Sequence, residues 1–396
     1  MHVAVNASIV DARPTGLGIY TTSVVRELAG MLEDGDRLTV LTGYPEAFAG
    51  SGADVVALSR FVQPRYGKPG GMFRLAWTQT ALPALLRRGG YDLFYSTTHH
   101  GLPYRLPGVP QVLTIQNDVE VSFRFPAQHR LQYRYFRHVV PRLMRASARV
   151  VTTSRYALEV LRRIYGLPEE RLAFAYNGYD AGTFRPEPGP EEAAVRARYG
   201  AAGDYLFTVG AFYPHKNVET LLAALPEVRR RHPALRLVIA GYAEAYLGPL
   251  LAGLDAETRG AVVAHPYVAQ RDLAALYRGA AAFVFPSLHE SFGIPLVEAM
   301  AAGCPVIASR ASALPEIGGD AVLFVEAGSA PALAGAIDRV LAEPALRGAL
   351  VERGLARATA FGWRATARTI YDILRGAAAP RPLPAAPAGR AAALTS

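Results

Sequence analysis

The stretch His289-Glu290-Ser291-Phe292-Gly293-Ile294-Pro295-Leu296-Val297-Glu298 decides how the rest of the chain is interpreted. It follows the apolar run 281–286, which predicts a buried parallel strand. A helix of small residues is predicted over 294–302, and Gly303 and Pro305 end it. Two carboxylates and a glycine turn therefore lie where a strand ends and a helix begins. Ligands bind at this end of the strands in open α/β sheets.

The start of this predicted helix favours an anion or sugar site. The backbone N–H groups of Ser291, Phe292 and Gly293 would point out of a helix end that carries about +0.5 charge. Glu290 would face a sugar ring, and Glu298, inside the helix, would accept hydrogen bonds from a ribose diol. Taken alone, such a pair of glutamates is equally typical of an ordinary solvated surface.

The wider string around the two glutamates is more specific. Residues 286–309 read Pro-Ser-x-x-Glu-Ser-Phe-Gly-Ile-Pro-x-x-Glu-Ala-Met-Ala-x-Gly-x-Pro-Val-Ile-Ala-Ser. This string resembles the Glu-x7-Glu signature of the retaining family-4 glycosyltransferases, nucleotide-sugar-dependent enzymes with the GT-B fold. The resemblance implies two Rossmann-like, doubly wound parallel-sheet domains that face each other across a cleft, and a C-terminal helix that crosses back to the first domain.

A chain of 396 residues has room for two such domains, each with its own core. We predict an acceptor-side domain over 1–180, completed by a helix over 363–375 that Trp363 anchors. A donor-binding domain is predicted over 181–362. The remaining stretch, 376–396, is rich in Ala and Pro and is predicted to be a disordered tail.

The formal net charge is +9 and is unevenly distributed. Between Arg60 and Arg149, fourteen Lys and Arg residues face only three acids, and a basic helix is predicted over 128–145. This basic region, 60–149, suits phosphate-bearing partners or an anionic membrane surface, or it is simply a solvated arginine-rich face. No nucleic-acid-reading motif accompanies the charge, so we expect no nucleic-acid partner.

Location is predicted from the apolar runs and from the lone cysteine. No uncharged run approaches the roughly 18 residues that a membrane span needs, and no signal-peptide pattern precedes the first strand. Cys304 has no partner for an internal disulfide and is predicted to be a core thiol. We therefore expect a cytoplasmic protein, with peripheral contact at the inner face of the membrane as a further option.

The resemblance implies a donor site built mostly from the second half. Lys216 matches the family's diphosphate-binding lysine, and Asn217 is expected to cap the next helix. Tyr267 and Val268 match the stretch whose backbone reads the base. The whole set implied for the donor is Gly16, Gly18, Gly210, Lys216, Asn217, Gly241, Tyr267, Val268, Glu290, Ser291, Phe292, Gly293, Ile294 and Glu298.

The acceptor is expected to contact residues of the first half, namely His99, His100 and Gln116. Gln116 stands where family members often have a histidine, and a glutamine can hydrogen-bond a sugar hydroxyl but cannot act as a base. Asp118 is then a candidate base. The expected catalytic set is Glu290, Lys216, Gln116 and Asp118. A second departure is Ala211, which stands where the family pattern has an arginine.

Neither a metal nor a cofactor is expected besides the nucleotide-sugar itself. The triplet Asp34-Gly35-Asp36 looks like the metal-binding Asp-x-Asp of another glycosyltransferase class, but it lies in a predicted turn between a helix and a strand. The paired His99 and His100 have no third ligand nearby in the sequence. The resembled enzymes do not need a metal.

The predicted function is transfer of a hexose, from a GDP-mannose or UDP-glucose type of donor, to a saccharide, a lipid-linked saccharide or a small molecule, with retention of anomeric configuration. One alternative is a catalytically silent GT-B partner subunit, which only Ala211 and Gln116 support. The other is a nucleotide-sugar 2-epimerase, which would need acid and base carboxylates in the cleft and is disfavoured by the Glu290–Glu298 string.

Overall fold

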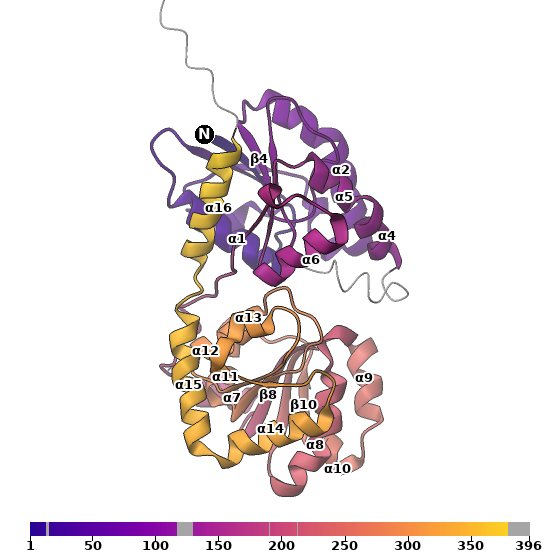
Figure 1. Cartoon of the computed structure of the whole chain (residues 1–396), viewed down its shortest axis with the longest axis vertical. Helices are drawn as coiled ribbons and strands as arrows, with labels where there is room; N and C mark the ends of the chain where they lie inside the picture. The colour runs from indigo at the N-terminus through magenta and orange to yellow at the C-terminus, as the bar shows by residue number, and fades with distance from the viewer. Residues whose placement is uncertain (13–15, 117–129, 190, 212, 379–396) are drawn as a thin grey trace, which may run out of the picture.

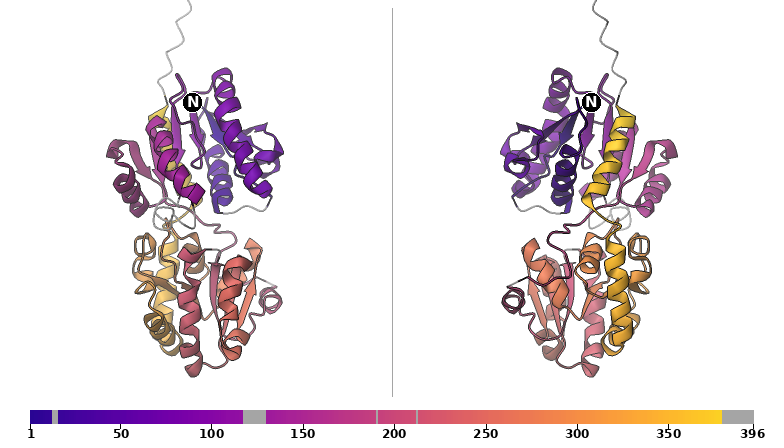
Figure 2. Two further views of the ribbon diagram at one scale, coloured as in Figure 1. Left: turned by 90° about the vertical axis from the view of Figure 1, so that its right-hand side faces the viewer. Right: turned by 90° about the vertical axis from the view of Figure 1, so that its left-hand side faces the viewer.

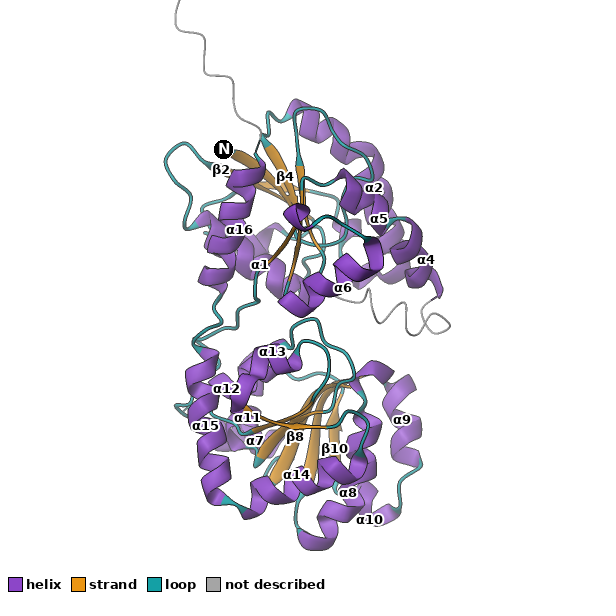
Figure 3. Ribbon diagram, in the orientation of Figure 1, coloured by secondary structure: helices purple, strands orange, loops and turns teal. Residues whose placement is uncertain are grey.

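The computed structural model describes residues 1–12, 16–116, 130–189, 191–211 and 213–378 as two α/β lobes stacked end to end (Figure 1). Each lobe is a parallel sheet with helices on both faces (Figure 3). The sheet orders are β3-β2-β1-β4-β5-β6-β7 and β10-β9-β8-β11-β12-β13. Two doubly wound sheets of this kind confirm the predicted GT-B architecture.

The first sheet has short strands, and its inner strands are buried on both faces as in other parallel sheets, whereas the edge strand β3 is largely exposed. Its strands are β1 (His2–Asn6), β2 (Arg37–Thr42), β3 (Asp54–Ala57), β4 (Leu93–Ser96), β5 (Gln111–Thr114), β6 (Arg149–Thr152) and β7 (Leu172–Phe174). Its helices are α1 (Gly16–Ala29), η1 (Pro45–Phe48), η2 (Arg60–Val62), η3 (Pro64–Tyr66), α2 (Gly67–Arg88), α4 (Arg130–His138), α5 (Val140–Ala146), α6 (Arg155–Tyr165) and η4 (Glu169–Arg171).

The second sheet begins after a short linker. Its strands are β8 (Tyr205–Ala211), β9 (Arg236–Tyr242), β10 (Val262–His265), β11 (Ala282–Phe285), β12 (Val306–Ser309) and β13 (Val322–Val325). Its helices are α7 (Glu192–Arg198), η5 (Pro214–Lys216), α8 (Val218–Arg231), α9 (Glu244–Ala252), α10 (Ala256–Gly260), α11 (Gln270–Gly279), α12 (Ile294–Ala301), α13 (Leu314–Gly318), η6 (Gly319–Ala321), α14 (Ala330–Ala342) and α15 (Pro344–Ala358). Tyr267 and Val268, which match the family's base-reading stretch, therefore lie just beyond the end of β10 at His265.

The C-terminal helix α16 (Trp363–Ala377) returns to the first lobe and packs beside α1; the right-hand view of Figure 2 shows it along the face of this lobe. Trp363 meets Tyr20 edge-on at 6.0 Å between ring centroids. Ile370 and Leu374, which share a helix face with Trp363, are buried in the same core. The expected crossing helix and its tryptophan anchor are both confirmed.

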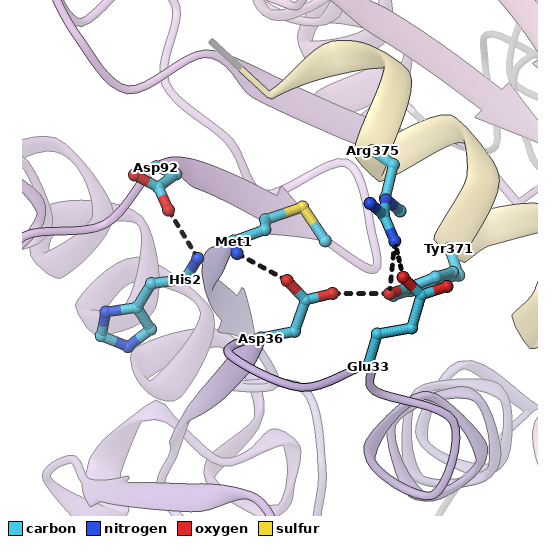
Figure 4. Close-up of polar contacts among 7 residues, drawn as sticks. All are labelled: Met1, His2, Glu33, Asp36, Asp92, Tyr371 and Arg375. Atoms are coloured by element: carbon cyan, nitrogen blue, oxygen red, sulfur yellow. Dashed lines mark hydrogen bonds and ion pairs between the residues drawn. The ribbon is translucent and has the colours of Figure 1, made fainter. Parts of the chain in front are cut away.

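Polar contacts fix the far end of α16 (Figure 4). The Tyr371 hydroxyl donates to Asp36 Oδ2 at 2.5 Å, and the Met1 amino group contacts Asp36 Oδ1 at 2.5 Å. Burial alone would raise the pKa of Asp36, but these two hydrogen bonds outweigh it and the pKa is lowered. Arg375 pairs with Glu33 beside them. The Asp-Gly-Asp triplet is therefore a structural turn, as the sequence indicated.

The predicted basic helix over 128–145 is wrong as a single element. In the described part, α4 ends at His138, and α5 begins at Val140 with Pro141 in its first turn. Proline fits a helix start but lacks the N–H that a helix interior needs, so the chain breaks there. Cys304 is buried and unpaired, which confirms a core thiol. No helix among the described residues is long and apolar enough to cross a membrane.

Candidate active site

Lys216 and Glu290 meet at the carboxyl edge of the second sheet. Lys216 Nζ lies 2.7 Å from Glu290 Oε1, although 74 positions separate them. Both side chains are largely buried, with 24% and 11% of their surfaces exposed. The loops that carry them are joined by a hydrogen bond from Leu288 N to His215 O of 2.8 Å. The structure thus brings together the lysine predicted for the diphosphate and the glutamate predicted for the sugar.

Three glycines shape the backbone around this pair. Gly210, Gly241 and Gly293 have φ values of 86°, 73° and 95°, in the left-handed region that side chains disfavour. A Cβ on Gly293 would also lie 2.9 Å from Leu314 Cδ2. The turn after β11 is further held by Ser312, whose hydroxyl accepts from Glu290 N at 2.7 Å. The backbone at this edge therefore has little freedom.

Asn217 lies at the start of α8, but it does not cap the helix as predicted. Its φ of 56° places it in the left-handed conformation, and its side chain makes no hydrogen bond to the helix amides. Instead, Nδ2 donates to Pro286 O at 3.0 Å, and Oδ1 accepts from the Thr220 hydroxyl at 2.8 Å. The side chain ties the lysine loop to the end of β11, so it supports the position of Lys216.

Glu298 is the second predicted carboxylate and is only 8% exposed. Burial raises the pKa of Glu298 to about 7; a hydrogen bond from Tyr277 opposes this shift, and the nearby charge of Asp180 adds to it. The Tyr277 hydroxyl donates to Glu298 Oε2 at 3.2 Å. A buried carboxyl group whose pKa is near 7 can accept hydrogen bonds from a diol when it is ionised.

Other predicted donor residues divide between core and surface. Phe292 and Val268 are buried in the core of the second lobe, so they offer only backbone to a ligand. Tyr267 is 63% exposed just beyond β10. Ile294 is half-buried and packs against the cores of both lobes, which places the start of α12 at their junction.

The two lobes contact each other directly at Ser291. Its hydroxyl donates to Gln116 O, from the end of β5. Its carbonyl accepts from the Thr153 hydroxyl at 3.1 Å and from the Ser154 hydroxyl at 2.6 Å. Ser154 also caps α6, because its hydroxyl accepts from Ala157 N at 3.0 Å. We call the turn between β11 and α12 the donor turn, after its predicted role. These hydrogen bonds hold it to the first lobe.

Glu316, in α13, provides a second contact across the junction. Its carboxylate accepts from Arg155 N and Tyr156 N at 2.8 Å each, and from the Tyr176 hydroxyl at 2.9 Å. It therefore satisfies the free N–H groups at the start of α6, which faces α13 in Figure 1. Glu316 thus joins the two lobes, and its partners lie 140 to 161 positions away in the sequence.

Space for a ligand remains between the lobes. A cavity of about 680 Å³ is lined by residues of α1, the linker, α11 and α16, among them Ile19, Asp180, Gln270 and Trp363. This volume lies in the range of small-molecule sites. Lys216, Glu290 and Glu298 are not among the residues that line this cavity.

In the first lobe, the predicted residues are only partly available to a ligand. Gly16 and Gly18 open α1, and a Cβ on Gly16 would meet nothing within 4 Å. Gln116 is 7% exposed and its amide donates to Thr97 O at 3.2 Å, so its side chain is engaged within its own lobe. Asp118 lies outside the described residues.

His99 and His100 follow β4 at the same edge. Their rings lie 4.5 Å apart between centroids, and His100 Nδ1 is 2.8 Å from the Thr98 hydroxyl. Burial, then the charge of Arg74, lowers the pKa of His99 to about 4. Burial, His99 and Arg74 together hold the pKa of His100 well below its usual range. Both imidazoles are therefore neutral at pH 7.

Among the described residues, no group of three or more His, Cys, Asp and Glu side chains has the arrangement of a metal site. The sequence did not indicate three sets of contacts. These are the Lys216–Glu290 ion pair, the hydrogen bonds from Thr153 and Ser154 to Ser291 O, and the position of Arg74 near His99 and His100. Of these, only the Ser154 cap had a local signal, a serine before a helix.

Comparison with known proteins identifies the lobes. Residues 14–182 match the family described as Glycosyltransferase Family 4, and residues 198–357 match Glycosyl transferases group 1. The chain is 30% identical to the O-antigen chain mannosyltransferase B of Escherichia coli over 293 residues, which is 72% of this chain and 75% of that protein.

Two further matches differ in kind. The D-inositol 3-phosphate glycosyltransferase of Frankia alni is 35% identical over 232 residues, which is 55% of this chain and about half (56%) of that relative. The structure of Anabaena HepE in complex with UDP-glucose superposes with a TM-score of 0.71 at 17% identity, covering 95% of this chain and 100% of that one. At that identity, the superposition shows a common fold.

Proposed function

The chain belongs to the family-4 glycosyltransferases of the GT-B fold, and from this premise we propose that it moves a hexose from a nucleotide-sugar to an acceptor hydroxyl with retention of configuration. GDP-mannose and UDP-glucose are the proposed types of donor, and the similar mannosyltransferase favours the first. The proposed acceptor is a saccharide, a lipid-linked saccharide or a small molecule. We propose that no metal or other cofactor takes part.

The observation that carries the proposal is the Lys216–Glu290 pair. Lys216 Nζ lies 2.7 Å from Glu290 Oε1, and the first lobe holds the neighbouring Ser291. When a donor binds, Lys216 would turn to the diphosphate and Glu290 would accept from sugar hydroxyls. Glu298 would accept hydrogen bonds from the ribose diol. The roles follow from charge: an ammonium for phosphate oxygens and carboxylates for hydroxyl donors.

The chemical task is to stabilise the leaving diphosphate. The bond between the anomeric carbon and the phosphate oxygen breaks, and the diphosphate leaves with the electron pair. Lys216 and the amides at the start of α12 offset the charge that develops there. The acceptor oxygen attacks the anomeric carbon from the same face, and its proton passes to the departing diphosphate. No strong protein base is then needed, which agrees with the engaged side chain of Gln116.

Peripheral membrane contact is a further part of the proposal. Phe61, Met72, Phe73 and Leu75 are exposed by 49%, 73%, 42% and 40% on η2 and α2. Arg60 and Lys68 are exposed close by in sequence. Apolar side chains beside cations suit an anionic bilayer. Sedimentation with phosphatidylglycerol vesicles, but not with phosphatidylcholine vesicles, would support this contact, and Met72→Glu should weaken it; equal recovery with both would contradict it.

The proposed reaction is tested by a screen of the pure protein with GDP, UDP, ADP and their sugars. A nucleotide at 100 times its dissociation constant should add about 2.7 kcal/mol to the free energy of unfolding. We expect one base to shift the melting temperature and its sugar to be slowly released. A chain that binds none of them, and releases no sugar in the presence of candidate acceptors, would contradict the proposal. The silent-subunit and epimerase alternatives gain no support from the relatives, whose names describe transferases.

A further inference from the structure

Arg74, on α2, is an arginine that the proposed reaction has not used. It is only 8% exposed. One guanidinium nitrogen donates to Val62 O at 2.6 Å. Nε is buried and has no hydrogen-bond partner. No carboxylate among the described residues pairs with this side chain. A buried charge without a counter-ion costs several kcal/mol, so its retention calls for an explanation.

Among the described residues, the electrostatic neighbours of Arg74 are polar and carry no negative charge. Its charge lowers the pKa values of His99 and His100, and Tyr135 is its electrostatic neighbour from α4. The Tyr135 hydroxyl donates to His99 O at 2.9 Å, and its ring lies 5.6 Å from that of His99. One cation beside neutral imidazoles is the composition of a site for an oxyanion, because the guanidinium and the imidazole N–H groups can donate and no described neighbour repels an anion.

The cluster lies at the edge where the acceptor is expected. His99 and His100 lie in the loop that follows β4, and His100 O accepts from Asn6 Nδ2, at the end of β1, at 2.9 Å. β5 is the next strand, and Gln116, just beyond it, contacts Ser291 of the donor turn. Since the carboxyl ends of parallel strands meet at one edge, the Arg74 cluster and the donor turn share one side of the junction.

We propose that Arg74, with His99, His100 and Tyr135 around it, binds an oxyanion carried by the acceptor, either a phosphate ester or a carboxylate. This inference rests on the proposed function for the identity of the ligand as an acceptor, but the anion site itself does not depend on it. The free Nε edge of the guanidinium is the part of arginine that forms paired hydrogen bonds to two oxygens of such a group. A neutral acceptor would leave the buried charge unpaired.

A purely structural role makes a different prediction. If Arg74 only ties α2 to η2 through Val62 O, its replacement would change stability and leave anion binding untouched. Arg74→Met is the useful variant, because replacing a buried charged side chain by an apolar one of similar volume is often tolerated. Arg87→Met is the matched control: the same helix and the same change, but an exposed position in the last turn.

The experiment is a titration of the full chain with inorganic phosphate, and separately with acetate, at ionic strength held constant with chloride. All variants carry Lys216→Ala, so that the proposed diphosphate site does not compete. We expect saturable thermal stabilisation in Lys216→Ala alone and with Arg87→Met, and at least tenfold weaker binding with Arg74→Met. Phosphate as the better ligand would indicate a phosphate ester on the acceptor, and acetate a carboxylate.

Two outcomes would overturn the inference: no saturable effect of either anion, or equal binding with Arg74→Met. Neither bears on donor use, which the nucleotide screen measures in the unmodified chain. Conversely, anion binding that depends on Arg74 in a chain that binds no nucleotide-sugar would preserve the anion site and reject the transferase proposal. The two hypotheses therefore fail separately.

Discussion

The two sides of the junction are built in different ways. On the donor side, Gly210, Gly241 and Gly293 hold backbone conformations that other residues disfavour, and Lys216 is already paired with Glu290. On the acceptor side, the polar residues come from β1, β4, β5 and α2, and the guanidinium of Arg74 has no counter-ion among the described residues. Backbone geometry and one ion pair define the proposed donor side. The proposed acceptor side is defined by its side chains, which come from several elements.

This difference indicates where specificity resides. A nucleotide diphosphate is common to many reactions, so a rigid backbone cradle with one lysine suffices for it. The acceptor varies, and side-chain neighbourhoods change without altering the fold. Substitutions on the donor side should therefore affect turnover, and substitutions on the acceptor side should affect which acceptor is used.

The strongest test of the donor side is Lys216→Ala. It removes the proposed diphosphate contact and leaves the largely buried Glu290 unpaired. Truncating one partner of such a pair costs about 2–5 kcal/mol, so we expect kcat/KM for the donor to fall about a hundredfold or more. The control is Lys68→Ala, the only other lysine of the chain and an exposed one. A fall of less than threefold in Lys216→Ala would show that the pair is not part of the site.

Glu298→Gln tests the raised pKa. A carboxyl whose pKa is about 7 when folded, against an ordinary 4.5, destabilises the fold as pH rises above 4.5, and the loss is complete above about 7. For this buried group, the full loss is about 3 kcal/mol as an upper bound. Urea unfolding at pH 5, 6, 7 and 8 should therefore show Glu298→Gln losing less stability with pH than the unmodified chain.

The same carboxyl should link donor binding to protons. If Glu298 accepts from a ribose diol, binding lowers its pKa and releases a proton near pH 6 to 7, so the binding enthalpy should vary with the ionisation enthalpy of the buffer. Glu326→Gln, at an exposed glutamate, serves as the control. Parallel stability profiles for Glu298→Gln and the unmodified chain would mean that Glu298 does not titrate in this range.

Glu316→Ala tests how firmly the two sides are held together, and we expect the smallest effect from it. It removes hydrogen bonds from Arg155 N, Tyr156 N and the Tyr176 hydroxyl across the junction. Water can replace these hydrogen bonds at the start of α6, so we expect the free energy of unfolding to fall by only about 1–2 kcal/mol. We predict a three- to tenfold fall in kcat/KM and a larger radius of gyration in small-angle scattering. An unchanged radius, or an equal effect of Glu326→Ala, would separate Glu316 from domain closure.

The GT-B fold and most of the donor side were predictable because their signals are local. The strand, glycine turn and helix around Glu290 are contiguous, and positive φ at Gly293 can be anticipated from a glycine at a strand-to-helix turn. The last helix has a local signal too, since Trp363, Ile370 and Leu374 recur at helical spacing, but its crossing to the first lobe was implied only by the family resemblance. The errors were also local: the break at Pro141 within the basic stretch and the role of Asn217, whose side chain bonds Pro286 O instead of a helix amide.

By itself, then, the sequence determined the two parallel-sheet domains, the family and the residue types at the donor turn, because hydrophobic period, glycine placement and a contiguous motif are written in neighbouring positions. Only the tertiary structure decided which charges meet. Lys216 pairs with Glu290, which is 74 positions away, and Ser291 accepts a hydrogen bond from Ser154, which is 137 positions away. Arg74 is buried near His99 and pairs with no carboxylate among the described residues. Such contacts depend on how strands order themselves in the sheet and how the two lobes close, and the energies of buried charges depend on that packing rather than on sequence proximity.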